Sequence, residues 1–154
     1  MKIFDILSKE AILADLKSRD KRGVLEELVT PVAHIADINH ELLVRVLMER
    51  EQLGSTGIGE GIAIPHGKVK NLESLILGFG LSRKGVDFES MDGLPTHIFF
   101  LLITPENTTG LHLKMLSRIS RILKNDLFKQ KLLNATNSNE IYSIIKEEEE
   151  EEEL

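Results

Sequence analysis

The run His97-Ile98-Phe99-Phe100-Leu101-Leu102-Ile103 decides the fold class of this chain. The run is nearly all apolar and rich in residues that favour strands. A second run of the same kind, LILGFGL, occupies residues 75–81. Because a strand that is apolar on both faces must be covered on both faces, the two runs predict central strands of a sheet with helices packed on each side.

The segments before these strands predict two amphipathic helices. From Asp20, the expected N-cap, to about Ala36, apolar residues recur every three or four positions. Asn39 is expected to cap a second helix that stops near Gly54. Residues 11–17 are expected to form a strand, although their periodicity also suits a helix, and residues 62–64 a short strand.

The C-terminal third predicts three more helices. Thr108 or Thr109 is expected to cap the first, Asn125 to begin a short second one, and Ser138, with Glu140 close behind, to open the third. Helices, then strands, then helices follow one another with no repeat and no linker. This order predicts an α/β fold, a single-domain sandwich in which a mixed β-sheet is flanked by helices on both faces.

Composition excludes several classes of protein. A chain of 154 residues that is 42% hydrophobic suits one globular domain. The absence of cysteine excludes disulfides, thiolate metal sites and a cysteine nucleophile on this chain. No apolar run approaches the roughly 20 residues of a membrane span, and the N-terminus lacks the apolar stretch of a signal peptide. We therefore expect a cytoplasmic protein with no direct membrane insertion.

The net charge of −6 is concentrated at one end, because seven of the 25 acids form the run 147–153. Without that run, 18 acids face 19 bases, so the rest of the chain is nearly neutral. We expect residues 1–146 to form the domain and residues 147–154 to be an acidic tail that buries nothing, either a helix extension or disordered. No basic tract with interleaved aromatics is present, so no nucleic-acid partner is expected.

Residues 53–68, LGSTGIGEGIAIPHGK, carry the candidate chemistry. Pro65 holds the preceding residue extended, and Gly67 is expected to let the chain turn away, which would leave His66 exposed at the end of a strand. Hydroxyls, glycine amides and cations surround this imidazole in the sequence, and all of them stabilise an oxyanion. The groups concerned are Ser55, Thr56, Gly67, Arg50 and Lys68. The segment predicts an imidazole that carries a phosphoryl group.

The same segment resembles the phosphorylation motif of the enzyme IIA domains of the fructose/mannitol class in the bacterial sugar phosphotransferase system (PTS), above all their nitrogen-regulatory and fructose-type members. Further blocks fall where that family has its own: residues 85–88, 92–93, 97–102, 105–106 and 111–114. The resemblance implies the PTS IIA type-2 fold and a phosphotransferase activity with a covalent intermediate. By resemblance His66 accepts a phosphoryl group, as tele-phosphohistidine, from the carrier HPr and passes it to a cysteine of a IIB domain.

The resemblance also assigns roles to other residues. His112 matches a family histidine that stabilises or orients the phosphoryl group, and Arg50 matches an arginine that neutralises its charge. Ser55, Thr56 and Gly67 are expected to bind the phosphoryl oxygens. Glu60 stands where many regulatory members have asparagine, and its carboxylate is expected either near the phosphoryl group or in solvent.

The remaining histidines, His34, His40 and His97, are expected to be structural or surface residues. Nothing has the spacing of a metal site, and the glycine-rich segment lacks the features of a nucleotide-binding loop, so neither a metal nor a cofactor is expected. Three hypotheses remain: a phosphohistidine carrier, a regulatory interaction protein of the nitrogen or potassium type that has no transport role and whose partners depend on the state of His66, and a binding module that is never phosphorylated.

Overall fold

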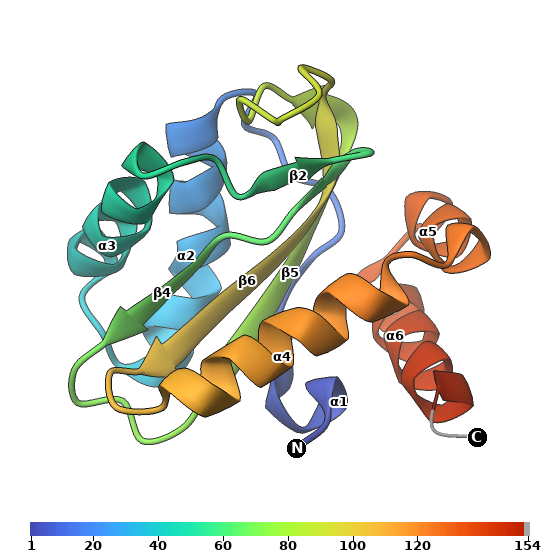
Figure 1. Ribbon diagram of the computed structural model, residues 1–154. Helices are drawn as coiled ribbons and strands as arrows, with labels where there is room; N and C mark the ends of the chain where they lie inside the picture. The colour runs from blue at the N-terminus through green and yellow to red at the C-terminus, as the bar shows by residue number, and fades with distance from the viewer. Residues whose placement is uncertain (153–154) are drawn as a thin grey trace.

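The computed structural model describes residues 1–152, in which strands and helices form one α/β sandwich (Figure 1). The helices are α1 Ile3–Ile6, α2 Lys21–Ala36, α3 His40–Gln52, α4 Thr109–Ile122, α5 Asp126–Leu133 and α6 Ser138–Glu152. The strands are β1 Leu7–Leu13, β2 Gly57–Gly59, β3 Ile62–Ala63, β4 His66–Val69, β5 Ile76–Val86 and β6 Thr96–Pro105. The predicted fold class is confirmed.

The strands form one mixed sheet in the order β1-β5-β6-β3-β2, and β4 also pairs with β6. Strand β6 is antiparallel to β5 but parallel to β3 and β4. Strands β3 and β4 lie one after the other along β6, with Ile62 opposite Ile98 and His66 opposite Leu102. The strand that the sequence singled out therefore lies at the centre of the sheet and aligns the segment that carries His66.

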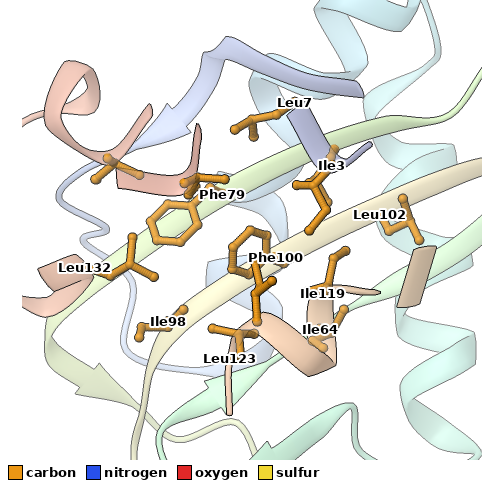
Figure 2. Packing of buried hydrophobic residues seen from close by; sticks show 14 of the residues in the cluster. Ile3, Leu7, Ile64, Phe79, Ile98, Phe100, Leu102, Ile119, Leu123 and Leu132 are labelled. Carbon is orange, nitrogen blue, oxygen red and sulfur yellow. The ribbon is translucent and has the colours of Figure 1, made fainter. Parts of the chain in front are cut away.

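The side chains of β6 alternate between two hydrophobic clusters. Ile98, Phe100 and Leu102 face the cluster built with α1, α4, α5 and α6, and the intervening apolar residues face α2 and α3. Figure 2 shows the first cluster, where the rings of Phe79 and Phe100 meet edge to face with centroids 5.0 Å apart. Burial on both faces explains why this strand is apolar throughout.

Side-chain caps begin several helices. The side chain of Asp20 accepts a hydrogen bond from the backbone N–H of Gly23, and that of Asn39 accepts one from Leu42, as predicted. Thr108 is the N-cap residue of α4, but its hydroxyl donates to the carbonyl of Pro105 instead of capping the helix. Helix α6 begins at Ser138, as predicted, and the side chain of Asn137 just before it accepts from the N–H of Glu140.

Two strands begin at other residues than predicted. The first strand covers Leu7–Leu13 rather than residues 11–17, because Leu7 and Leu13 pair with Leu77 and Gly80 of β5. His66 begins β4 instead of ending a strand, and the chain continues straight through Gly67. His66 is accordingly half-buried rather than exposed at a loop end.

The acidic run was expected to bury nothing, and this was wrong for two of its residues. Residues 147–152 continue α6, and Glu148 and Glu149 are buried. The carboxylate of Glu149 accepts hydrogen bonds from the backbone N–H groups of Ile3 at 2.5 Å and Phe4 at 2.8 Å. A buried carboxylate is tolerated there because the free amides at the start of α1 satisfy it. Residues 153–154 lie outside the described residues, and the division at residue 147 stays a prediction.

Candidate functional site

The register of β4 decides which way each residue of the His66 segment points. His66 and Lys68 pair with Leu102 and Thr104 of β6, and Leu102 faces the cluster covered by α4. Because paired residues of neighbouring strands share a face, the side chains of His66 and Lys68 lie on the α4 side of the sheet. Gly67 lies on the opposite side, where a Cβ atom would come within 2.8 Å of Val46 Cγ1 on α3.

The backbone fixes the tautomer of His66. Its Nδ1 lies 2.7 Å from the carbonyl oxygen of Ile64. A carbonyl oxygen only accepts hydrogen bonds, so Nδ1 carries the proton and Nε2 keeps its lone pair. Burial, with smaller contributions from Arg50 and Lys68, lowers the pKa of His66 below its ordinary value. The ring is therefore a neutral imidazole at neutral pH, with Nε2 as its nucleophilic atom.

His112, in the first turn of α4, lies next to His66. The two ring centroids are 5.3 Å apart and the ring planes are inclined by 58°. Burial, followed by the nearby His66 and Lys68, lowers the pKa of His112 to about 4, so this ring is also neutral at neutral pH. Its Nδ1 lies 2.7 Å from the hydroxyl oxygen of Thr104, which is fully buried in β6.

A surface pocket of about 490 Å³ opens over the two histidines, between α3 and α4. Of the six residues predicted for the site, His66, His112, Arg50 and Gly67 line this pocket, together with Lys68. Arg50 donates from Nη1 to the carbonyl of Gly54 at 2.8 Å, and Lys68 donates from Nζ to the hydroxyl of Thr109 at 2.9 Å. The pocket therefore combines one nucleophilic nitrogen with two cations. Its other lining residues are Val46, Glu49, Leu53, Leu113 and Leu116.

Ser55 and Thr56 do not line this pocket. Ser55 donates its hydroxyl to the carbonyl of Phe88, and Thr56 is buried and donates its hydroxyl to the carboxylate of Glu51. Glu51 also accepts from the backbone N–H of Thr56 and forms an ion pair of 3.2 Å with the buried ammonium of Lys21. Both hydroxyls thus hold the loop that follows α3, a role that their position in a polar, glycine-rich segment did not reveal.

The alternatives for Glu60 are resolved by its place in the fold. It is exposed at the tip of the β2–β3 hairpin, where its φ of 57° and that of Gly61, 80°, match a tight turn. Its backbone N–H donates to Asp92, and Glu60 is not among the residues that line the pocket.

The other three histidines lie away from the pocket. His34 is exposed on α2, a ring nitrogen of His40 lies 3.0 Å from the carbonyl of Glu26, and one of His97 lies 2.8 Å from that of Ser82. Sequence reasoning missed Thr104, the neighbour of His112. The available signal was a polar residue directly after the apolar run 98–103.

Within residues 1–152, no helix is both long and apolar enough to cross a membrane. The same part of the chain contains no group of three or more histidine, aspartate or glutamate side chains arranged to hold a metal ion.

The mixed sheet thus places His66 beside His112 and in one pocket with Arg50. Residues 5–148 match the family model of the phosphoenolpyruvate-dependent sugar phosphotransferase system, EIIA 2. The chain belongs to this family, whose members are phosphoryl-transfer carriers.

Individual relatives lie on two branches of the family. A nitrogen regulatory protein of Bradyrhizobium diazoefficiens is 41% identical over 94% of this chain and 95% of its own length. The fructose-specific EIIABC component of Bacillus subtilis is 38% identical over 94% of this chain, which corresponds to 23% of that longer protein. The crystal structure of the nitrogen regulatory protein IIA-Ntr from Neisseria meningitidis superposes with a TM-score of 0.87 at 31% identity, covering 93% of this chain and 98% of the other.

Proposed function

We propose that the chain is a cytoplasmic phosphohistidine carrier. In this proposal His66 accepts a phosphoryl group from the phosphohistidine of HPr. It then either passes the group to a cysteine of a IIB domain or uses its phosphorylation state to control partner proteins. The observation that carries the proposal is the hydrogen bond from Nδ1 of His66 to the carbonyl of Ile64, which leaves Nε2 as the nucleophile and predicts tele-phosphohistidine.

The transfer itself exchanges one N–P bond for another. The lone pair of Nε2 attacks phosphorus as the N–P bond of the donor breaks, and the electron pair of that bond returns to the donor imidazole. The proton stays on Nδ1 of His66, which donates it in a hydrogen bond to the carbonyl oxygen of Ile64, so no general base is required. The protein contributes position and charge neutralisation, as in other phosphoryl transfers.

Charge neutralisation falls to residues that line the pocket. Arg50 presents a planar fork that suits phosphoryl oxygens, and Lys68 adds a second positive charge. His112 stands beside His66 and stabilises or orients the phosphoryl group. The hydroxyls of Ser55 and Thr56 are engaged elsewhere, so we do not include them, and Gly67 contributes through the close packing of β4 on α3.

The rim of the pocket suits protein partners. Leu53 is 85% exposed and Leu113 is 60% exposed, and both line the pocket. Apolar side chains exposed around a reactive group are typical of protein interaction sites. This supports an HPr-type donor and a IIB-type acceptor, and the relative named as an EIIABC component joins A, B and C parts in one protein.

A regulatory role is supported by the similarity to a protein that carries that name. The nitrogen regulatory relative is 41% identical to this chain, and the fructose-specific relative is 38% identical. In that role the phosphoryl group adds negative charge at the leucine-rimmed surface and thereby changes which partner binds. The chemistry at His66 is the same in both roles.

The proposal is tested by incubating the protein with phosphoenolpyruvate, enzyme I and HPr and measuring its intact mass. We expect one acid-labile phosphoryl group in the wild type, none in His66→Ala, and normal labelling in the matched control His34→Ala, which removes an exposed histidine. His112→Ala should still be labelled, but more slowly. Labelling of His66→Ala, or no labelling of the wild type, would refute the proposal and favour a binding module.

A further inference from the structure

Thr104 does not line the pocket itself, but its hydroxyl contacts His112, which does. It is fully buried in β6, two residues after Leu102, so its side chain faces the same α4 side as His66. Its hydroxyl oxygen lies 2.7 Å from Nδ1 of His112. Every neighbour of Thr104 from residue 97 to residue 103, His97 excepted, is apolar, so packing alone does not explain a hydroxyl at this position.

The direction of this hydrogen bond follows from the surroundings of the hydroxyl. Within residues 1–152, Nδ1 of His112 is the only hydrogen-bond partner of the Thr104 hydroxyl, and no buried side-chain polar atom there lacks a partner. If Nδ1 carried the proton, the Thr104 hydroxyl would accept it and its own hydrogen would be buried without an acceptor, which is unfavourable. The hydroxyl therefore donates, and Nδ1 of His112 accepts.

This direction determines where the proton of His112 lies. The ring is neutral at neutral pH because its burial opposes protonation, so it carries one proton. With Nδ1 accepting from Thr104, that proton is on Nε2. His66 has the opposite tautomer, since the carbonyl of Ile64 holds its proton on Nδ1. The paired rings thus present a lone pair on one Nε2 and an N–H group on the other.

We propose that Thr104 is a positioning residue whose hydroxyl holds His112 in the Nε2–H tautomer, so that His112 donates a hydrogen bond to a phosphoryl group carried by His66. The donor role rests on the proposed function, but the tautomer does not. Thr104 itself touches neither the donor nor the transferred group; it acts through His112.

The test compares Thr104→Val, which keeps the branched shape and removes the hydroxyl, with Thr104→Ser, which keeps the hydroxyl. Long-range proton–nitrogen NMR of protein with labelled histidine, at neutral pH and without phosphoryl donor, reads the tautomer of each ring. We expect His112 to be protonated on Nε2 in the wild type and in Thr104→Ser, and to shift toward the Nδ1–H form in Thr104→Val. His66 should stay protonated on Nδ1 in all three proteins.

A wild-type His112 protonated on Nδ1 would overturn the proposal, whether or not the protein accepts a phosphoryl group. This measurement also decides the matter if Thr104→Val fails to fold. The functional arm measures the rate of phosphoryl acceptance from phosphorylated HPr. Loss of one hydrogen bond should slow Thr104→Val by about threefold to tenfold, with the wild-type rate restored in Thr104→Ser. A wild-type rate in Thr104→Val would overturn the donor role, whereas no acceptance by the wild type would refute only the carrier function.

Discussion

The carbonyl oxygen of Ile64 lies 2.7 Å from Nδ1 of His66, two residues further along the chain. Pro65 stands between them, and its own carbonyl accepts the backbone N–H of Leu102 at 3.0 Å, which attaches this segment to the central strand. The fixed φ of proline and this pairing orient the ring with groups of the backbone alone. The backbone therefore fixes Nε2 as the nucleophilic nitrogen of His66 before any partner binds.

The lowered pKa of His66 predicts how the acceptor titrates. Burial disfavours the protonated ring, so the midpoint of its titration should lie below the ordinary value of 6.5. Above that midpoint Nε2 keeps its lone pair, and acceptance of the phosphoryl group does not become limited by protonation of His66. Proton NMR of the ring across the range from about pH 8 to pH 5 measures the midpoint directly. A midpoint above 6.5 would contradict the account of His66 as a neutral nucleophile.

His112 should make the stability of the protein depend on pH. Its pKa is about 4 in the folded state and 6.5 ordinarily. Above pH 6.5 the ring is neutral in both states and adds no pH dependence. As the pH falls from 6.5 toward 4, the unfolded ring binds a proton that the folded ring does not, so stability is lost. The loss between pH 7 and pH 5 should be about 2 kcal/mol.

The variant His112→Gln lacks this titration and serves as the comparison. Urea unfolding at the two pH values should show that the wild type loses about 2 kcal/mol more than His112→Gln does. Other groups titrate in both proteins and cancel in the difference. Equal losses would mean that His112 is not held neutral by its surroundings.

Glu149, within the acidic run, should contribute strongly to the free energy of unfolding. Glu149 accepts from two backbone amides of α1 and from Nε of Arg118 on α4, at 3.0 Å. Glu149→Ala should lower the free energy of unfolding by about 2–4 kcal/mol, because it leaves buried polar groups without their acceptor. Glu147→Ala, an exposed position on the same helix, should change it by less than about 0.5 kcal/mol. Similar losses in the two variants would show that only the charge of the run matters.

Gly67 should be required for the geometry of the pocket. A Cβ atom there would lie 2.8 Å from Val46 Cγ1, so the Val46 side chain or α3 itself must move. Arg50 lies one turn further along that helix. Gly67→Ala should destabilise the fold by about 1–3 kcal/mol and slow phosphoryl acceptance. Gly110→Ala, where a Cβ atom meets nothing within 4 Å, should leave stability unchanged or slightly higher. Thermal unfolding and acceptance rates of the two variants check this, and a wild-type rate in Gly67→Ala would contradict it.

The parts of the fold that the sequence predicted are those set by local patterns. The apolar run of β6 and the caps Asp20 and Asn39 depend on residues within a few positions, and these predictions were confirmed. The start of β1 at Leu7 and the strand that begins at His66 depend on pairing with distant strands, which no local pattern contains. Long-range register therefore accounts for the errors.

The residues of the site also divide into those that the sequence predicted and those that depend on long-range contacts. His66, His112 and Arg50 were predicted through a resemblance that spans the chain, and the structure brings all three to one pocket. Thr56 was expected at the site because its hydrogen bond to Glu51 cannot be seen in the sequence. Glu149 was overlooked because its partners, the amides of Ile3 and Phe4, lie 146 and 145 residues away. A hydroxyl or carboxylate near a site in sequence predicts little until its hydrogen-bond partner is known.

The position of the phosphoryl group on the imidazole shows which nitrogen of which histidine is the nucleophile. Protein with labelled histidine is phosphorylated with phosphoenolpyruvate, enzyme I and HPr, and nitrogen–phosphorus NMR identifies the bonded nitrogen. We predict a phosphoryl group on Nε2 of His66, with the proton kept on Nδ1 toward the carbonyl of Ile64. A phosphoryl group on Nδ1 of His66, or on His112, would contradict it.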